Sequence, residues 1–398
     1  METLISSTTD KDLAEEKNRP RISFFYFLGH LPHHFDHARL VFEKLGGEVL
    51  VTTPFARDYC LRRGIPVKML DRCEKEIRSW VPEDVPVTVE YLNQQKGVVF
   101  FFDVFPNMAK EIKSLLRIML FHGNSLKQSW FEDWRIKALR SEYDFITTLG
   151  PFWERILKRK GVPENKFLRI GQTRTDTLGH LQPEAIEAMK RDFLKDRHFP
   201  EKPIVAYIPT WYGVSSVGCL GPHILETISE RFVVLFRPHP ETPSSVLDSC
   251  RKVICGKKHI VDLSCEEPEG WNPMHWLLMS DLLILDMMGS LTAEAILTDK
   301  PIIFTDPRSP WRVIWKQWLF SRPIRRFYRS CPRLGFRQLR DLNTMVERNR
   351  AIQKTDHARE EIRNKLFYHR DARATDALVE FVESLEIKSG MKPKSGKS

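Results

Sequence analysis

Two histidine-containing segments follow apolar runs that are typical of buried strands. In FHGNSLK (121–127), His122 comes directly after the run RIMLF, and Gly123 allows the backbone to turn sharply. Because the unperturbed pKa of imidazole is about 6.5, His122 is a candidate base for taking a proton from an alcohol. In LFRPHP (235–240), prolines hold Arg237 and His239 on a rigid turn, where a guanidinium and an imidazole suit an anionic oxygen group. A histidine satisfied by loop carbonyls, or a charge pair in a loop, would give the same patterns.

A glycine–serine turn before a helical segment indicates a phosphate site. In LDMMGSLTAEA (285–295), Gly289 and Ser290 precede the helix, so that its free N–H groups would face the strand ends. Ser290 and Thr292 would add hydroxyl donors, and Glu294 would hold the diol of a ribose. A serine that only caps the helix is the alternative.

The histidine-rich segment GHLPHHFDH (29–37) has the composition of a metal site. It contains four histidines and Asp36, and His33 and His37 would lie four apart on a helix, where they can share an ion. A clear third partner at ligand spacing is missing, so we interpret the segment as a polar rim of a cleft that faces an acceptor.

A second group of possible ligands, around His259, fits no common zinc module. Its other members are Cys250, Cys255 and Cys265. Reduced, mostly buried thiols are the preferred interpretation. We therefore expect neither a metal site nor a tightly bound cofactor, and the sequence leaves a requirement for a divalent cation open.

The elements that must position these residues alternate between apolar runs and helical segments. The run 21–29, a helix within 33–47 and a second run at 48–53 make the start of a doubly wound sheet. Because the runs are almost wholly apolar, we expect parallel strands that are buried on both faces. The further strands expected are 97–105, 117–123, 144–150, 167–171, 203–210, 232–240, 259–263, 281–290 and 300–306, with helices at 151–160 and 291–297.

A chain of 398 residues favours two domains. We expect an α/β fold with two doubly wound Rossmann-type domains, at 21–175 and 176–385, between disordered tails at 1–20 and 386–398. Two such domains facing each other form a cleft at the C-terminal ends of both sheets, where α/β folds bind ligands.

The net charge of +10 is concentrated in one aromatic segment, 311–340. The segment contains nine Lys or Arg and no Asp or Glu, so the rest of the chain is close to neutral. A helix that starts at Ser309-Pro310 would place its tryptophans on one face, beside cations, which is typical of a segment that docks on anionic lipid. The docking residues that we expect are Trp311, Trp315, Trp318, Arg322, Arg325, Arg326 and Arg329.

Two alternative roles for segment 311–340 stay open. Its tryptophans would pack inward, or its arginines and aromatic rings would bind nucleic acid. No known nucleic-acid motif accompanies it, so nucleic acid is not an expected partner. The chain has no apolar run of about 18 residues and no signal-peptide core, and we expect a cytoplasmic protein, peripheral on the inner face of the cell membrane.

Taken together, these clusters resemble the CDP-glycerol glycerophosphotransferase family, the teichoic-acid primase and polymerase class with a GT-B fold. The resemblance runs from Phe100 to Val382 and rests on the order and spacing of several motifs. The matching segments are HGNSLK (122–127; HGTPLK in the family), GQTRTD (171–176; GYPRND), PTW (209–211), RPHP (237–240), SDLLILD and DKPIIF (280–286 and 299–304) and DARAT (371–375; DGKAS).

The resemblance implies a GT-B-like transferase of cell-envelope polymer synthesis. An acceptor hydroxyl, lipid-linked or polymeric, would attack the β-phosphorus of CDP-glycerol or a similar CDP-activated alditol, and CMP would leave. Its implied catalytic residues are His122 and His239. On the donor side, in the second domain, it implies Thr210, Arg237, Gly289, Ser290, Thr292, Glu294, Arg373 and Thr375. On the acceptor side, in the first domain, we expect His30, His33, Asn124, Ser125, Lys127 and Arg174.

One departure from the family motifs keeps an alternative enzyme open. The family's DYSS is here Asp286-Met287-Met288-Gly289-Ser290, which is similar to the DSGGxxEE loop of nucleotide-sugar 2-epimerases and some glycosyltransferases. The alternative is therefore a GT-B glycosyltransferase or epimerase that uses a nucleotide sugar as donor.

Overall fold

The computed structural model describes residues 23–70, 85–105, 107–123, 128–211, 215–266, 271–287, 289–305, 327–351 and 357–385. Several residues and ranges named in the sequence analysis lie outside this part of the chain. They are the tails 1–20 and 386–398, Asn124, Ser125 and Lys127, the helix start at Ser309-Pro310, and Trp311, Trp315, Trp318, Arg322, Arg325 and Arg326.

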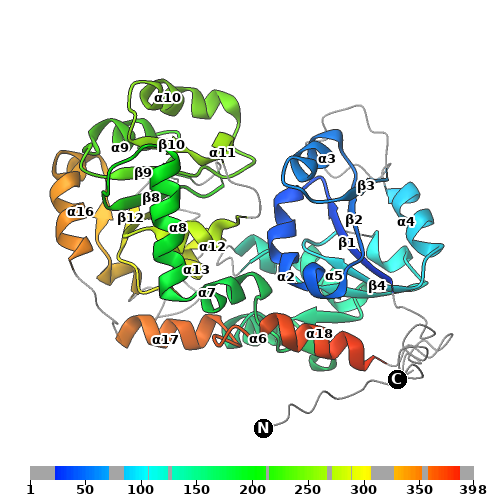
Figure 1. Cartoon of the computed structure of the whole chain (residues 1–398). Helices are drawn as coiled ribbons and strands as arrows, with labels where there is room; N and C mark the ends of the chain where they lie inside the picture. Colours follow the sequence, from blue (N-terminus) through cyan, green and yellow to red (C-terminus); the bar gives the residue numbers. More distant parts are fainter. Residues whose placement is uncertain are drawn as a thin grey trace, which may run out of the picture.

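A seven-stranded parallel sheet forms the core of the first domain (Figure 1). Its strand order is β3-β2-β1-β4-β5-β6-β7, so the order reverses between β1 and β4. The central strand β4 is buried along its whole length, as expected for a strand covered on both faces. The strands are β1 (Ser23–Gly29), β2 (Glu48–Val51), β3 (Val67–Met69), β4 (Gly97–Phe101), β5 (Leu115–Met119), β6 (Phe145–Thr147) and β7 (Phe167–Leu168).

The second domain repeats this arrangement in a six-stranded parallel sheet of order β10-β9-β8-β11-β12-β13. The predicted strands of both halves are confirmed, apart from their ends. The strands are β8 (Ile204–Ile208), β9 (Val233–Phe236), β10 (Ile260–Asp262), β11 (Leu282–Asp286), β12 (Ile302–Thr305) and β13 (Arg333–Leu334). The sequence did not predict β3 and β13, because two or three partly polar residues at a sheet edge give no apolar run.

Helices cover both sheets and connect their strands (Figure 1). In the first domain they are α2 (Arg39–Leu45), α3 (Pro54–Leu61), α4 (Val85–Asn93), α5 (Asp133–Ser141) and α6 (Pro151–Arg159), with short 3-10 helices at η1 (Pro32–His37), η3 (Ala109–Glu111), η4 (Gln128–Phe131), η5 (Glu164–Lys166) and η6 (Thr173–Thr175). The helices that follow the first domain in the chain are α7 (Asp176–His180), α8 (Pro183–Asp196), α9 (Gly221–Thr227), α10 (Ser244–Cys255), α11 (Leu263–Glu266), α12 (Pro273–Met279), α13 (Ser290–Ala295), η8 (Phe336–Asp341), α16 (Leu342–Arg350), α17 (His357–Leu366) and α18 (Ala374–Ser384).

The segment expected to form one helix within 33–47 is divided in two. It forms the 3-10 helix η1 and then α2, and the change occurs at Ala38, whose φ is −107°. A 3-10 helix has about three residues per turn instead of 3.6. His33 and His37 therefore do not lie above one another as they would on a continuous α-helix.

The C-terminal part of segment 311–340 belongs to the second domain's core. Phe327 and Tyr328 are buried against Phe304 of β12, and Leu334 of β13 is buried as well. These three residues thus pack inward, whereas Phe336 is 37% exposed and stays at the surface beside exposed arginines.

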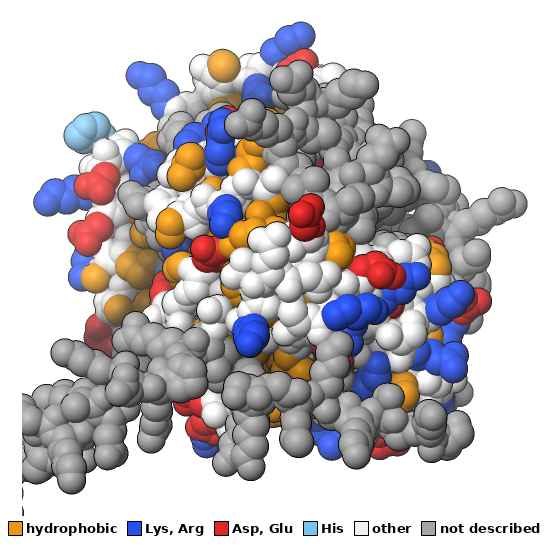
Figure 2. Space-filling model, turned by 90° about the vertical axis from the view of Figure 1, so that its right-hand side faces the viewer, with side chains coloured by type: hydrophobic (Ala, Val, Ile, Leu, Met, Phe, Trp, Pro, Cys, Tyr) orange, Lys and Arg blue, Asp and Glu red, His pale blue; other side chains and the backbone are white. Residues whose placement is uncertain are grey.

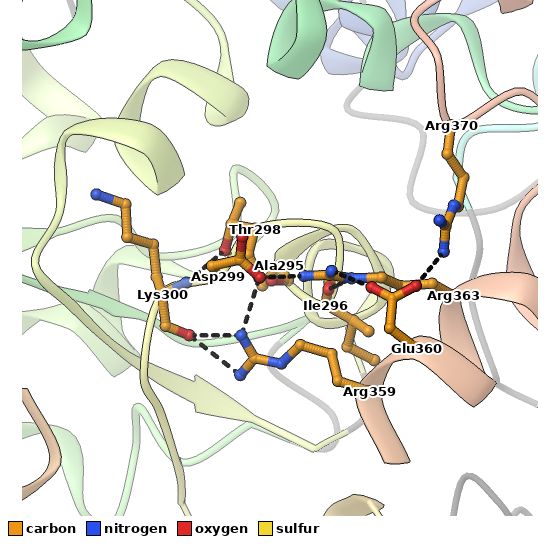
Figure 3. A network of polar contacts seen from close by, with 9 residues as sticks. All are labelled: Ala295, Ile296, Thr298, Asp299, Lys300, Arg359, Glu360, Arg363 and Arg370. Atoms are coloured by element: carbon orange, nitrogen blue, oxygen red, sulfur yellow. Dashed lines mark hydrogen bonds and ion pairs between the residues drawn. The ribbon is translucent and has the colours of Figure 1, made fainter. Parts of the chain in front are cut away.

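The last two helices return from the second domain to the first (Figure 1). Helix α17 packs against α6, and α18 packs against α2 through the buried Ala374, Leu378 and Val382. The range 176–385 therefore does not all fold with the second sheet. The arginines of α17 still hold the second domain: Arg359 and Arg363 donate to the carbonyls of Ile296, Thr298 and Lys300 that follow α13 (Figure 3).

A buried aspartate connects the interdomain segment to the start of α18. Asp176 is fully buried, and its carboxylate accepts the N–H groups of Ala374 (3.2 Å) and Thr375 (2.6 Å). These two N–H groups have no partner within α18, because the first turn of a helix leaves its donors unsatisfied.

Asp176→Ala should lower the free energy of unfolding by about 2–3 kcal/mol, since two buried N–H groups lose their acceptor. Asp176→Asn should cost less, because the amide oxygen still accepts one bond. Urea unfolding measures both values. The control is Asp376→Asn on the exposed side of α18, where the ion pair with Lys44 should contribute no more than about 1 kcal/mol. Equal costs for Asp176→Ala and the control would contradict this role.

Candidate active site

The C-terminal edges of both sheets face one cleft between the domains. Its walls come from the loops after β1, β5, β8, β9 and β11 and from η6. The lining residues are His33, His34, Asp36, His37, His122, Arg174, Ile208, Pro209, Thr210, Arg237, His239, Pro240, Pro273, Gly289, Ser290, Leu291 and Thr292. Gly123 is required here: its φ is +116°, and a Cβ would lie 2.8 Å from the Cβ of Ser290 across the cleft.

His122 has the tautomer of a general base. Its Nδ1 lies 2.9 Å from the Phe102 carbonyl oxygen, which can only accept, so the proton is on Nδ1 and Nε2 is the basic nitrogen. A carboxylate oxygen of Asp103 lies 3.9 Å from the same Nδ1. Burial raises the pKa of Asp103, against the opposing effect of Arg135 at 3.8 Å. A His–Asp pair of this kind stabilises the imidazolium that forms when the base takes a proton.

The histidines of η1 surround His122 with neutral rings. His34 stacks on His122 with 3.9 Å between ring centroids and 13° between planes. Burial, as the largest effect, and the neighbouring histidines lower the pKa of His34 well below its ordinary value. The pKa values of His33 and His37 are lowered as well, first by burial and then by nearby cationic groups. These imidazoles are therefore hydrogen-bonding groups of the cleft at neutral pH and add no charge to it.

Two buried arginines make the cleft an anion site. Arg237 follows β9 and is 8% exposed, and burial lowers its pKa to about 10, so it remains charged at neutral pH. Arg174 of η6 is 6% exposed and lines the same cleft. Cations in a poorly hydrated site interact strongly with phosphate oxygens, because little water screens them.

Glu294, expected to hold a ribose, is instead the partner of Arg174. Nη2 of Arg174 donates to both of its carboxylate oxygens, at 2.5 and 2.6 Å, and Gln172 donates to one of them. Glu294 is fully buried and does not line the cleft. Burial raises its pKa, and Arg174 opposes that rise. Its role in this structure is to hold the Arg174 guanidinium at the cleft wall.

Asp286 at the end of β11 positions the opposite wall. Its carboxylate accepts from the backbone N–H of Thr210 (2.8 Å) and of Ser216 (3.1 Å) and from the hydroxyl of Ser215 (2.9 Å). Its own carbonyl accepts from the hydroxyl of Thr292 (2.6 Å). One buried residue thus fixes two of the expected donor-binding residues, Thr210 through its carboxylate and Thr292 through its backbone carbonyl.

The structure brings most of the expected site residues together. Those in the cleft are His33, His122, Arg174, Thr210, Arg237, His239, Gly289, Ser290 and Thr292. Four others do not line it. His30 lies at the end of β1, Glu294 is buried behind Arg174, Arg373 is exposed beside Glu380, and Thr375 is buried at the start of α18.

Sequence reasoning missed Asp103 and did not single out His34. Asp103 stands two residues after the end of β4, next to the position where the strand order of the sheet reverses, and the segment FFFDVF contains it as its lone charge. The sequence therefore contained a signal for Asp103. It contained no signal for the stacking of His34 on His122, because that stacking depends on the 3-10 geometry of η1.

Comparison with known proteins agrees with this fold. The model of one family, described as CDP-Glycerol:Poly(glycerophosphate) glycerophosphotransferase, matches residues 87–384. A search of curated proteins found no match. A structure of the wall teichoic acid polymerase TagF is similar with a TM-score of 0.60 and 13% identity, covering 93% of this chain and 90% of that one. A TagF variant soaked with CDPG gives the same TM-score and identity, over 93% and 89%.

A more distant structure, Anabaena HepE in complex with UDP-glucose, has a TM-score of 0.51 and 10% identity and covers 92% of this chain and all of that one. At these identities the likenesses show the fold. They confirm the predicted GT-B-like arrangement of two parallel-sheet domains.

Asp103→Asn should lower kcat by about 10–100-fold, because the imidazolium of His122 loses a nearby negative charge. The Phe102 carbonyl still fixes the tautomer of His122 in this variant. The loss should therefore be smaller than the roughly 10⁴-fold loss of kcat in a catalytic triad, where the aspartate itself fixes the tautomer. The acid limb of the kcat/KM profile should move to lower pH, since the charged ring becomes less stable. Asp144→Asn, which removes an ion pair with Arg117 away from the cleft, should leave that limb in place. Identical pH profiles for wild type and Asp103→Asn would refute the His–Asp pair.

Proposed function

The chain belongs to the CDP-glycerol:poly(glycerophosphate) glycerophosphotransferase family, and from that premise we propose that its interdomain cleft transfers glycerol phosphate from CDP-glycerol to a hydroxyl group of a lipid-linked or polymeric acceptor. It is an enzyme of the CDP-glycerol glycerophosphotransferase type. The observation that carries the proposal is the placement of a tautomerically fixed base, His122, beside two buried arginines.

In the proposed step, Nε2 of His122 takes the proton of the acceptor hydroxyl. The acceptor oxygen forms a bond to the β-phosphorus of the donor, and the bond from that phosphorus to the oxygen bridging it to the α-phosphate breaks. The electron pair stays on that oxygen, and CMP leaves. Asp103 stabilises the imidazolium, as the geometry of the pair supports.

Positioning and charge stabilisation supply most of the catalysis of phosphoryl transfer. Arg237 and His239 from the second domain, with the hydroxyl groups of Ser290 and Thr292, would hold the diphosphate. Arg174, held by Glu294, would neutralise the charge that grows on the oxygens in the transition state. The burial of both arginines supports this assignment, because a site with little water makes each contact stronger.

We further propose that the enzyme works at the inner face of the cell membrane through segment 311–340. None of the described helices combines the length and the apolar character needed to cross a bilayer. On the face drawn in Figure 2, Lys and Arg side chains are mixed with Asp and Glu, so this face offers no surface of a single sign among the described residues. The concentration of nine cations in one segment supports that segment as the contact with anionic lipid.

His122→Ala and Arg237→Gln should separate chemistry from binding. His122→Ala should lower the single-turnover rate constant by about 10²–10⁴-fold and leave CDP-glycerol affinity nearly unchanged, because the base acts only on the acceptor proton.

Arg237→Gln should weaken CDP-glycerol and CMP binding by about 1.5–3 kcal/mol, the usual contribution of a charge-assisted bond. Calorimetry and rapid-quench kinetics measure the two effects. Normal turnover of the first variant, or unchanged affinity of the second, would rule out the assigned role.

Replacing Arg322, Arg325, Arg326 and Arg329 with Ser should release the protein from anionic vesicles. Each cation near such a surface contributes about 1 kcal/mol, so four together control a reversible attachment. Co-sedimentation with vesicles with and without anionic lipid measures it, and high salt should have the same effect as the substitutions. A wild-type protein that ignores anionic vesicles at low salt would disprove the docking.

A further inference from the structure

Three side chains with metal-binding atoms converge at the cleft from both domains. His33 belongs to η1 of the first domain, and His239 and Glu241 follow β9 in the second. One nitrogen or oxygen atom from each lies within 4.8 Å of the other two. Within the described part of the chain, no other three His, Cys, Asp or Glu side chains meet this condition.

The distances are close to those of a bound ion. The rings of His33 and His239 are 5.2 Å apart at their centroids and 77° from coplanar, and Nδ1 of His239 lies 3.9 Å from a carboxylate oxygen of Glu241. Bonds of about 2.0–2.1 Å in a tetrahedral zinc site place neighbouring ligand atoms about 3.3 Å apart. The three side chains therefore need to approach by no more than about 1.5 Å, which is within the range of rotamer adjustment and a small domain movement.

The hydrogen bonding of His239 also suits a metal. The backbone N–H of Glu241 donates to Nδ1 of His239 at 3.2 Å, so this nitrogen presents its lone pair and the ring proton is on Nε2. The hydrogen bond is long, and a metal can replace it at small cost. The imidazole of His33 faces that of His239 across the cleft, in position to offer a second nitrogen to the same ion.

We propose that His33, His239 and Glu241 form a binding site for a divalent transition-metal ion of the zinc type that bridges the two domains. Two imidazoles and one carboxylate match the ligand preference of Zn²⁺, whereas Mg²⁺ prefers oxygen ligands and octahedral geometry. Three protein ligands leave the fourth position of a tetrahedral ion for water or for an oxygen of a bound molecule. This site differs from the sequence-based expectation of no metal, because its third ligand, Glu241, lies more than 200 positions from His33 and only the fold brings them together.

An ion bound in this way would favour the closed arrangement of the domains. One ligand comes from the first domain and two come from the second, so separating the domains removes a ligand. Binding to only one of two arrangements shifts the equilibrium towards it. The proposal does not depend on the transfer reaction, since the ligand set alone defines it.

Zinc and cobalt binding to the full-length protein test the site. After treatment with a chelator, the wild-type protein should bind one Zn²⁺ in competition with a chromophoric chelator, and Co²⁺ should give the strong visible absorption of a tetrahedral site. His33→Ala and Glu241→Gln should each weaken zinc binding at least about tenfold and reduce that absorption, because each removes one of three ligands. Metal-free thermal unfolding should be the same for wild type and Glu241→Gln, since Glu241 is exposed.

His369→Ala is the matched control. His369 and Asp371 are also two residues apart, with 3.7 Å between Nδ1 and a carboxylate oxygen, but they do not belong to a group of three ligands among the described residues. Zinc affinity should be unchanged in this variant. Failure of the wild-type protein to bind zinc, equal affinity in all four proteins, or a cobalt spectrum with sulfur-to-metal charge transfer would overturn the proposal.

Discussion

The buried ion pair between Arg174 and Glu294 joins the two domains at the point where the cleft closes. Arg174 comes from η6, at the end of the first domain, and Glu294 comes from α13 in the second. Removing one partner of such a pair leaves an uncompensated buried charge, which typically costs about 3–5 kcal/mol. The domains also meet closely at Gly123, where a Cβ would lie 2.8 Å from the Cβ of Ser290. The base and the anion-binding residues share one site because this pair holds the domains together.

The charge balance of the cleft follows from that pairing. One wall presents guanidinium groups, and η1 presents imidazoles whose pKa values burial lowers, so they stay neutral. The carboxylate of Glu294 is already satisfied by Arg174, and Asp103 lies behind His122. Asp36 lines the same cleft, and its charge raises the pKa of Arg237 against the effect of burial. Because little water screens the Arg237 guanidinium, it would interact strongly with the diphosphate of a bound donor.

The sequence predicted the elements that burial controls and missed those that depend on contacts between distant segments. Strands such as β4 and β11 were readable because every residue in them is apolar or terminal. Gly289 and Ser290 after β11 line the cleft as expected, whereas Asp103 after β4 was missed. The ion pair of Glu294 was not readable, because Arg174 lies 120 positions away and a ribose diol is an equally good partner for a carboxylate. Thr375 and α18 were assigned to the second domain by their order in the chain, whereas Asp176 and the apolar surface of α2 hold them against the first. The 3-10 form of η1, which stacks His34 on His122, followed from local backbone geometry that periodicity does not resolve.

The nucleotide released during turnover tests most directly whether this cleft directs attack at phosphorus and not at carbon. Phosphorus-31 NMR of a reaction with CDP-glycerol and a hydroxyl acceptor should show CMP and a new phosphodiester in equal amounts. A parallel reaction with UDP-glucose should show neither UDP nor UMP above the enzyme-free control. Release of a nucleoside diphosphate, CDP from the first donor or UDP from the second, would place the attack at carbon and contradict the proposed chemistry.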